Sequence, residues 1–421
     1  MRFVHPDRSA AVRQDRRRVL ALGAGLALSA LLPSGALAQR AAMPFPQWVE
    51  HFRARARARG IDDEVYTRVM RGVKPDTSVY ALDAAQPEFN EELWQYLNRR
   101  VSDWRIGVGR ERARQYASLL GRIEREYGVD RHIMLGLWGM ESAFGEVVDN
   151  RKLMRPVIPA LAALAWGDPR RRRYWEQELL NALVIIQRGW STPEEMTGSW
   201  AGAMGHTQWM PEVWLNMGVD FDRDGRISPF APDDALAGTA RYLVARGKYR
   251  RGEKWGHEVR LPARFNTKLA DRRTWRTVAA WEKLGVTRAD GKPSRNHGMR
   301  ARLWLPVEGG PAFLLGQNFY AVRSYNPSYN YALAIVHLGD RIAGADGFVQ
   351  PFPGGERVPT LAELQEIQKR LTALGFDTGG VDGRVGRDTM RAVQAFQRRA
   401  GMEPADGYPG LKVLNRLRQG L

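Results

Sequence analysis

The stretch DRHIMLGLWGMESAFG, residues 130–145, decides the fold of the central part of this chain. Asp130 is a favourable helix N-cap, because its carboxylate can accept free backbone N–H groups of the first turn. The eight residues before Glu141 are all apolar or glycine, so we expect a central helix that is buried on nearly every face. Since Glu141 follows Ile133 and Leu137 at four-residue steps, it shares one stripe of the helix with them.

A carboxyl group on a buried helix changes its acid–base behaviour. Loss of hydration disfavours the charged form, which raises the pKa and keeps the carboxyl protonated near neutral pH. A group that protonates a glycosidic oxygen needs this property. The spacing of Glu141 is equally compatible with a solvated carboxylate at the rim of the helix, so position alone leaves both interpretations open.

Outside this helix the chain divides into stretches of different character. Residues 45–187 follow a helical pattern broken by Gly and Pro, whereas short alternating pieces between about residues 247 and 311 predict a small β-containing insert. Residues 348–359 are rich in Pro and Gly, which predicts a flexible linker. The predicted fold class is therefore mainly α, with one body over residues 39–347 and a separate module over residues 360–421.

The first 38 residues have the layout of an export signal. A basic segment with Arg16, Arg17 and Arg18 precedes an apolar run over residues 19–32, and residues 36–38 form a small-x-small cleavage site. A bilayer span needs ~20 residues, so a membrane anchor is the weaker alternative. We expect a mature chain in the periplasm without an integral membrane span, and the arginine pair resembles a twin-arginine signal.

The composition excludes several classes of function. The 421 residues include no Cys, which removes disulfide frameworks, thiolate zinc sites and cysteine nucleophiles. Lys and Arg outnumber Asp and Glu by 64 to 46, and the formal net charge of +18 favours an anionic polymer as partner. Nucleic acid is not expected, because the sequence has no Gly-rich phosphate loop, zinc spacing or aromatic ribonucleoprotein motif.

Three segments carry a resemblance to a known family. They are LWGMESAFG at residues 137–145, GSWAGAMGHTQWMP at residues 198–211 and YNPSYNYALA at residues 325–334. In composition and order they resemble the signatures of the membrane-bound lytic transglycosylase B (MltB) family, and the resemblance spans roughly residues 43–345. It implies a lysozyme-like helical catalytic domain that carries the β-containing insert.

The resemblance also implies roles for individual residues. Glu141 would be the sole acid and base, and no cofactor would take part in the chemistry. The residues that match positions lining the sugar subsites, or that offer apolar ring faces to the sugars, are Ser199, Gln208, Tyr242, Tyr325, Asn326 and Tyr331. Each of these also has a purely structural interpretation, at a helix end or in the core, and His206 is expected to be structural.

The reaction implied by the resemblance is cleavage of the β-1,4 bond between MurNAc and GlcNAc of peptidoglycan without water, which leaves a 1,6-anhydro-MurNAc end. Two alternatives stay open. A muramidase-type hydrolase would use Glu141 together with a second carboxylate, and a wall-binding protein would keep the fold without activity. The implied partners are peptidoglycan glycan strands and other cell-wall enzymes.

The C-terminal module begins with a capping box, in which Thr360 and Glu363 each satisfy a backbone N–H group of the other. Two helical patterns separated by the Asp382-Gly383 turn make most of residues 360–418 resemble the peptidoglycan-binding domain of the three-helix type. This resemblance implies a module that holds the chain on the wall, and the alternative is a helical hairpin of unknown ligand.

The segment DFDRDGRI, which starts at Asp220, begins like an EF-hand calcium loop. Asp220, Asp222 and Asp224 stand at positions 1, 3 and 5, with Gly at position 6 and the carbonyl of Arg226 at position 7. Position 12 holds Ala, and the family resemblance points to Asp234 as the closing ligand of a longer loop. We expect a weak, structural calcium ion, because two arginines lie in the loop; a metal-free turn is the alternative.

Overall fold

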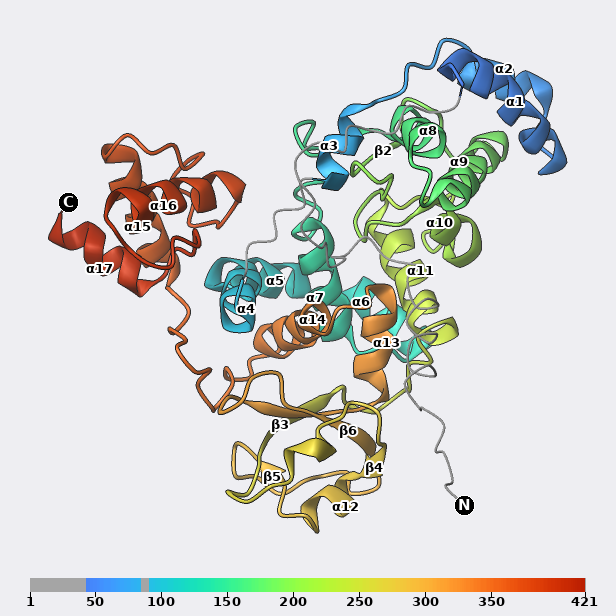
Figure 1. The fold of residues 1–421 in the computed structure, drawn as a ribbon. Helices are drawn as coiled ribbons and strands as arrows, with labels where there is room; N and C mark the ends of the chain where they lie inside the picture. The colour runs from blue at the N-terminus through green and yellow to red at the C-terminus, as the bar shows by residue number, and fades with distance from the viewer. Residues whose placement is uncertain (1–42, 85–90, 421) are drawn as a thin grey trace, which may run out of the picture.

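The computed structural model describes residues 43–84 and 91–420, so the predicted export signal lies outside the described residues. Each of four bodies has its own hydrophobic core. In Figure 1 a central helical body lies between an N-terminal helical lobe, a sheet-containing body at the bottom and the C-terminal module at the left. No described helix is long and apolar enough to cross a membrane.

The central body surrounds the helix that the sequence places at the centre. Its helices are α4 (Leu93–Arg100), α5 (Asp103–Gln115), α6 (Ala117–Tyr127), α7 (Arg131–Ser142), α11 (Pro232–Ala245), α13 (Gln317–Tyr325) and α14 (Tyr329–Ile342). Helix α7 is buried from Ile133 to Met140, as its all-round apolar pattern predicts. The body therefore packs around α7, and helix α14 is its main neighbour.

The N-terminal lobe is also helical. It contains α1 (Phe45–Ala58), α2 (Asp63–Met70), α3 (Ser78–Ala84), α8 (Val157–Gly167), α9 (Arg172–Gln187) and α10 (Pro211–Met217). Helix α8 is rich in Ala and Leu and is buried over most of its length, so it packs closely against α9. A short antiparallel ribbon of β1 (Arg155–Pro156) and β2 (Thr197–Gly198) leads from this lobe to the second family segment.

The β-containing body holds an antiparallel sheet in the order β4-β6-β7-β3-β5. The strands are β3 (Gly256–Arg260), β4 (Arg276–Thr277), β5 (Thr287–Arg288), β6 (Arg300–Trp304) and β7 (Ala312–Leu315), with η1 (Thr267–Leu269) and α12 (Val278–Glu282) between them. The sheet extends past the predicted end of the insert at residue 311, and α13 follows at once. The sequence did not predict strand β7, because periodicity alone does not distinguish a buried strand from a helix over four apolar residues.

The C-terminal module is a three-helix unit of α15 (Leu361–Ala373), α16 (Arg387–Arg399) and α17 (Leu411–Gln419). The capping box at its start forms, with Glu363 N–H donating to Thr360 Oγ1 at 3.2 Å and Thr360 N–H donating to Glu363 Oε2 at 2.8 Å. Its core is made of aliphatic side chains and Phe396.

Two glutamines repeat the same contact inside this module. Gln368 on α15 accepts the backbone N–H of Gly383 at 2.7 Å, and Gln397 on α16 accepts that of Gly407 at 2.7 Å. Each glutamine also donates to the Asp that precedes the glycine. Each helix thus binds its following Asp-Gly turn, and both glycines have positive φ angles, at +71° and +78°.

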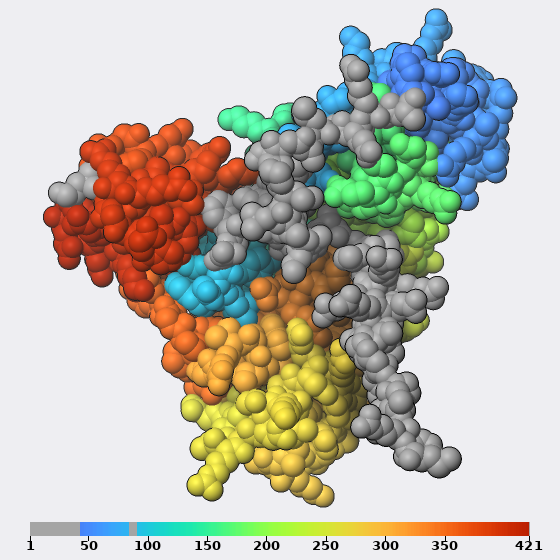
Figure 2. Space-filling model, in the orientation of Figure 1, coloured from blue at the N-terminus to red at the C-terminus, as the bar shows by residue number. Residues whose placement is uncertain are grey.

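The module and its linker contact the rest of the chain. Gln350 in the linker donates to Glu258 on β3 at 3.0 Å, so the segment is held at the sheet despite its Pro- and Gly-rich sequence. Asn98 on α4 donates to the hydroxyl of Tyr408 at 2.8 Å, and Trp94 meets the Tyr408 ring edge-on at 4.9 Å. Figure 2 shows the module as a distinct lobe beside the central body.

Candidate active site

Glycines bring α7 and α14 into direct backbone contact. A Cβ atom on Gly136 would lie 2.3 Å from the carbonyl oxygen of Ile335, and one on Gly339 would lie 2.5 Å from that of His132. No larger residue fits at either position without separating the helices. This close approach sets where the C-terminal end of α7, and with it Glu141, lies relative to α14.

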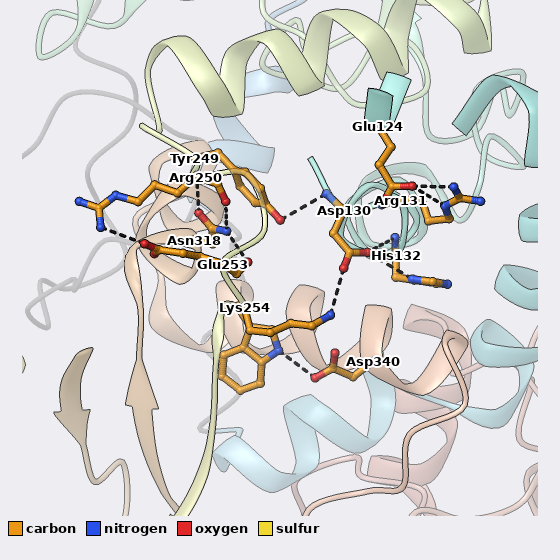
Figure 3. A network of polar contacts seen from close by, with 11 residues as sticks. Glu124, Asp130, Arg131, His132, Tyr249, Arg250, Glu253, Lys254, Asn318 and Asp340 are labelled. Carbon is orange, nitrogen blue, oxygen red and sulfur yellow. Dashed lines mark hydrogen bonds and ion pairs between the residues drawn. The ribbon is translucent and has the colours of Figure 1, made fainter. Parts of the chain in front are cut away.

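A polar network holds the other end of α7. The Asp130 carboxylate accepts the backbone N–H of His132 at 2.9 Å and pairs with Lys254 at 3.2 Å (Figure 3). The next residue, Trp255, donates its indole N–H to Asp340 on α14 at 2.8 Å. The predicted N-cap forms, and the same contacts join α7 to α14 and to the start of the β-containing body.

The chain turns sharply directly after Glu141. Ala143 and Phe144 have positive φ angles of 52° and 60°, and Gly145 follows at 92°. Non-glycine residues rarely adopt this left-handed region, and such strain persists only where the surroundings enforce it. A Cβ atom on Gly145 would lie 2.5 Å from the ring of His206, so the turn is packed against the second family segment.

His206 joins the two family segments. Its Nδ1 accepts the indole N–H of Trp138 at 3.1 Å, and its carbonyl accepts the hydroxyl of Ser142 at 2.6 Å. Burial lowers the pKa of His206 to about 4, so the imidazole is neutral at physiological pH. These contacts give His206 a structural position, because its Nδ1 is already occupied by a buried indole.

The pKa of the Glu141 carboxyl is raised, a point that the sequence leaves undecided. Its carboxyl lies deep among protein atoms, while part of the residue's surface stays accessible. Burial raises the pKa to about 7, against the opposing effects of the Tyr331 hydroxyl, which donates a hydrogen bond to Oε1, and of the Arg100 charge. Glu141 therefore keeps its proton to a much higher pH than an exposed carboxyl group does.

Three tyrosines from the predicted set lie along this site. Tyr331 is 8% exposed, and burial raises the pKa of Tyr331 and Tyr325 well above the ordinary value, so both keep their protons. Tyr325 donates to the carbonyl of Thr207 at 2.6 Å. Tyr242 meets the Tyr325 ring edge-on at 5.1 Å and donates to the carbonyl of Ser324 at 2.9 Å.

Ser199 and Gln208 lie in the loop of the second family segment. In this loop His206 contacts Trp138 on α7, and Thr207 contacts Tyr325 on α13. The Ser199 hydroxyl accepts the backbone N–H of Ala203 at 3.2 Å. Gln208 has a positive φ of 54° and donates from Nε2 to a backbone carbonyl at 2.9 Å. Neither forms a hydrogen bond with Glu141 in the part of the chain that the structure describes.

Asn326 stands at the junction of α13 and α14. Its Oδ1 accepts the backbone N–H of Ser328 at 3.1 Å, and Ser328 is the N-cap of α14. The residue therefore helps to shape the turn from which Tyr331 reaches Glu141.

Two arginines near Glu141 were not predicted from the sequence. Arg100, at the end of α4, acts electrostatically on Glu141, and burial lowers the pKa of Arg100 itself. Arg105 donates from Nε to the carbonyl of Gly139 on α7 at 3.1 Å. The pattern contains no signal for either, because an arginine in a charged helix normally indicates a solvent-facing position.

The acidic loop has the geometry of a partial cation site. One carboxylate oxygen from each of Asp220, Asp222 and Asp224 lies within 4.8 Å of the others, and Oδ1 of Asp220 is buried with no hydrogen-bond partner. Oxygen donors of this kind suit calcium. The side chain of Arg226 turns away to the carbonyl of Trp190 at 3.1 Å.

Asp234, the predicted closing ligand, lies outside this cluster of three carboxylates. It is 1% exposed and accepts the backbone N–H groups of Phe221 at 2.7 Å and Ser228 at 2.8 Å. Burial raises the pKa of Asp234 to about 6. In this structure Asp234 braces both ends of the loop.

Comparison with protein families matches residues 44–340 to the transglycosylase SLT domain. The chain belongs to this family. Residues 360–417 match a family described as a putative peptidoglycan binding domain. The resemblance inferred from the three segments and the mainly helical fold class with a helical C-terminal module are both confirmed.

Individual relatives agree with this assignment. The membrane-bound lytic murein transglycosylase B of Escherichia coli is 31% identical over 283 residues, which cover 66% of this chain and 73% of the relative. The crystal structure of SltB3 from Pseudomonas aeruginosa with NAG-anhNAM-pentapeptide is 41% identical and covers 89% of this chain and 99% of its own, with a TM-score of 0.69. The enzyme is thus a peptidoglycan lytic transglycosylase.

A third relative bears on the acidic loop. The Escherichia coli lytic transglycosylase SLT35, solved in complex with calcium, is 27% identical with a TM-score of 0.60, and the match covers 75% of this chain and 98% of that one.

Proposed function

We propose that Glu141 acts first as the acid and then as the base in a cleavage that ends in a 1,6-anhydro-MurNAc product. The observation that carries the proposal is the buried carboxyl with a pKa of about 7, hydrogen-bonded to Tyr331. A group whose pKa lies near the working pH donates and accepts a proton at comparable cost. One residue can therefore serve both steps.

The first step breaks the glycosidic bond. Protonated Glu141 gives its proton to the oxygen between MurNAc and GlcNAc, the bond from that oxygen to C1 breaks, and the GlcNAc residue leaves as an alcohol. The carbonyl oxygen of the MurNAc N-acetyl group stabilises the positive charge that develops at C1. Glu141 is left as a carboxylate, which the Tyr331 hydroxyl and the Arg100 charge stabilise.

The second step closes the anhydro ring. The Glu141 carboxylate removes the proton from the C6 hydroxyl of the same sugar, and O6 forms a bond to C1. The carboxyl regains its proton, so no water is consumed. A hydrolase would need a second carboxylate at the bond, whereas the group that is hydrogen-bonded to the Glu141 carboxyl among the described residues is the Tyr331 hydroxyl.

The predicted binding residues suit an N-acetylated sugar strand. The hydroxyl of Ser199 and the amides of Gln208 and Asn326 can hydrogen-bond with hydroxyl and N-acetyl groups. The rings of Tyr242, Tyr325 and Tyr331 offer apolar faces to the pyranose rings.

We place this reaction in the periplasm, after removal of the export signal. The C-terminal module binds the wall and raises the local concentration of glycan strands at Glu141.

The acidic loop binds a structural calcium ion through Asp220, Asp222 and Asp224 and the carbonyl of Arg226. Asp234 supports this site by accepting the backbone N–H groups of Phe221 and Ser228.

Mass spectrometry of the fragments released from purified sacculi tests the reaction. The wild type should release anhydro-muropeptides, and Glu141→Gln should release none. Reducing-end products would show hydrolysis instead. Release of nothing by a wild type that still binds sacculi would contradict the proposed chemistry altogether.

A further inference from the structure

Three charged side chains connect the N-terminal lobe to the helix that carries Tyr242. Glu178 is on α9, Glu212 is in the first turn of α10, and Arg246 directly follows the last residue of α11. Helices α10 and α11 contact each other and lie side by side in Figure 1. The mechanism proposed for Glu141 involves none of the three charged residues.

The contact between Glu212 and Arg246 is a two-pronged ion pair. Arg246 donates from Nη1 to Oε2 of Glu212 at 2.8 Å and from Nη2 to Oε1 of the same carboxylate. Asn216, one turn further along α10, also donates to Oε1, at 2.7 Å. Because guanidinium and carboxylate groups are both planar, paired hydrogen bonds of this kind fix the orientation of the guanidinium as well as its position.

Glu178 holds the start of α10 against α9. Its Oε2 accepts the backbone N–H of Glu212 at 2.9 Å, and the residue is only 2% exposed. Separating a buried carboxyl from its hydrogen-bond partner costs free energy, so this contact resists movement of the backbone. Glu212 is therefore anchored in the N-terminal lobe, and its side chain holds Arg246 from a fixed point.

Arg246 lies over the ring of a predicted sugar-binding residue. Its guanidinium carbon is 5.3 Å from the ring centroid of Tyr242, within the range of cation–π attraction. Tyr242 precedes Arg246 by four residues, so both side chains lie on the same side of the helix. Burial raises the pKa of Tyr242, and the Arg246 charge opposes this rise, as expected for a guanidinium close to the ring.

Three contacts hold the Tyr242 ring. Its hydroxyl donates to the carbonyl of Ser324 at 2.9 Å, the Tyr325 ring meets it edge-on at 5.1 Å, and Arg246 lies over its face. The first two contacts come from α13, whereas the position of Arg246 is set by Glu212 in the N-terminal lobe. Tyr242 is only partly buried, so the ring keeps accessible surface for a pyranose.

We propose that Arg246, fixed by Glu212, is a positioning residue that holds the Tyr242 ring in the orientation in which it binds a sugar of the glycan strand. This inference rests on the proposed function and adds a residue outside the predicted binding set. Arg246 acts through Tyr242 and needs no contact with the sugar itself. Its effect is on substrate binding, whereas the proton transfers at Glu141 do not depend on it.

A double-mutant cycle on the full chain tests the proposal. KM and kcat on soluble glycan strands are measured for Arg246→Gln, for Tyr242→Ala and for the double variant. A positioning role makes the two substitutions non-additive, because Arg246 has nothing to orient once the ring is removed. Arg246→Lys keeps a positive charge and is the conservative variant. Arg241→Gln, which changes an exposed arginine of the same helix, is the matched control.

Arg246→Gln should raise KM by about fivefold, the effect that one cation–π contact at a partly buried site supports. Its kcat should stay within about twofold of the wild type, as for lost uniform binding. Arg246→Lys should recover part of the loss, Glu212→Gln should also raise KM, and Arg241→Gln should match the wild type. In the Tyr242→Ala background, Arg246→Gln should add nothing. An unchanged KM in Arg246→Gln, or an equal rise in both backgrounds, would overturn the proposal.

A general loss of folding would show as a lowered Tm together with a lowered kcat in Arg246→Gln. In that case Arg246→Lys and Glu212→Gln complete the same cycle with Tyr242→Ala, and additive effects on KM would reject the positioning role. If Tyr242→Ala alone leaves KM unchanged, Tyr242 binds no sugar and the proposal is wrong, although the anhydro product can still be formed.

Failure of the proposed function gives a different result. A wild type that releases reducing ends contradicts the mechanism at Glu141, yet the cycle on KM remains valid. For a wild type that cleaves nothing, Kd for a soluble tetrasaccharide of N-acetylglucosamine replaces KM in the same set of variants. Equal effects of Arg246→Gln on this Kd with and without the Tyr242 ring would reject the proposal independently of any activity.

Discussion

The hydroxyl of Tyr331 donates a hydrogen bond to Oε1 of Glu141 across a sequence separation of 190 residues. The donor lies in the first turn of α14 and the acceptor in the last turn of α7. Because this bond and the Arg100 charge favour the carboxylate while burial favours the protonated acid, the pKa of about 7 is a balance between opposed effects.

Tyr331→Phe removes the larger of the two effects that lower the pKa of Glu141, so this pKa should rise above its value of about 7. The alkaline limb of the kcat/KM profile against pH should move to higher pH, because the acid form persists longer. Activity at the optimum should fall by about tenfold, the loss typical for one hydrogen bond to a charged group. Tyr127→Phe, which changes a phenol on α6, should leave the profile in place.

The stability of the protein should depend on the ionisation of Glu141. Its pKa rises from about 4.5 in the unfolded chain to about 7 in the folded one, so folding takes up a proton between these values. The contribution of Glu141 to the free energy of unfolding is fully present below pH 4.5 and is lost as the pH rises through 7. Glu141→Gln should therefore be more stable than the wild type at pH 8, by at most about 3 kcal/mol. Thermal unfolding at pH 5 and pH 8 measures this, and an equal difference in Tm at both would contradict it.

Gly339→Ala should destabilise the protein, because its Cβ would lie 2.5 Å from the His132 carbonyl oxygen. Overpacking of this kind costs about 1–3 kcal/mol, and the displaced α14 should also lower activity. Gly107→Ala is the matched control, since a Cβ there on helix α5 meets nothing within 4 Å. It should raise stability by up to about 1 kcal/mol through helix propensity. Urea unfolding of both variants measures these two changes in the free energy of unfolding.

Calcium should bind the acidic loop and stabilise the folded chain. Titration with calcium should release or absorb heat and raise Tm, as for any ligand that binds the native state alone. Asp222→Asn should weaken both effects, whereas Asp271→Asn, which removes a carboxylate outside the loop, should preserve them. The absence of heat and of a Tm shift in the wild type would reject the site.

Deletion of residues 360–421 should separate wall binding from catalysis. Binding to sacculi should weaken, while kcat/KM on short soluble glycans should change little, since no described residue of the module forms a hydrogen bond with Glu141. Tyr408→Phe, which removes only the contact with Asn98, should retain wall binding. An equal loss on soluble glycans and on sacculi would refute the tethering role.

Part of the site could be predicted because its signals are local. The N-cap at Asp130, the buried stripe of α7 and the capping box at Thr360 each depend on residues within a few positions of one another. The acidic loop is equally local. For Asp234, the resemblance gave a ligand role, whereas the folded loop uses its carboxylate to bind two backbone N–H groups.

Other parts could not be predicted because their signals are ambiguous. Arg100 lies in a helix with charged residues, where the pattern favours exposure, yet its charge acts on Glu141. The linker has the composition of a flexible spacer, yet Gln350 is held by Glu258. In both cases the partner lies in another part of the chain, and no local spacing reveals it.

The sequence by itself determined the helical class, the family and the presence of a helical C-terminal module, because periodicity, caps and contiguous motifs act over short distances along the chain. Only the tertiary structure decided the raised pKa of Glu141, the contact of His206 with Trp138 and the effect of the Arg100 charge on Glu141. Each of these depends on which groups from distant segments share a desolvated space, and that is a property of packing in three dimensions.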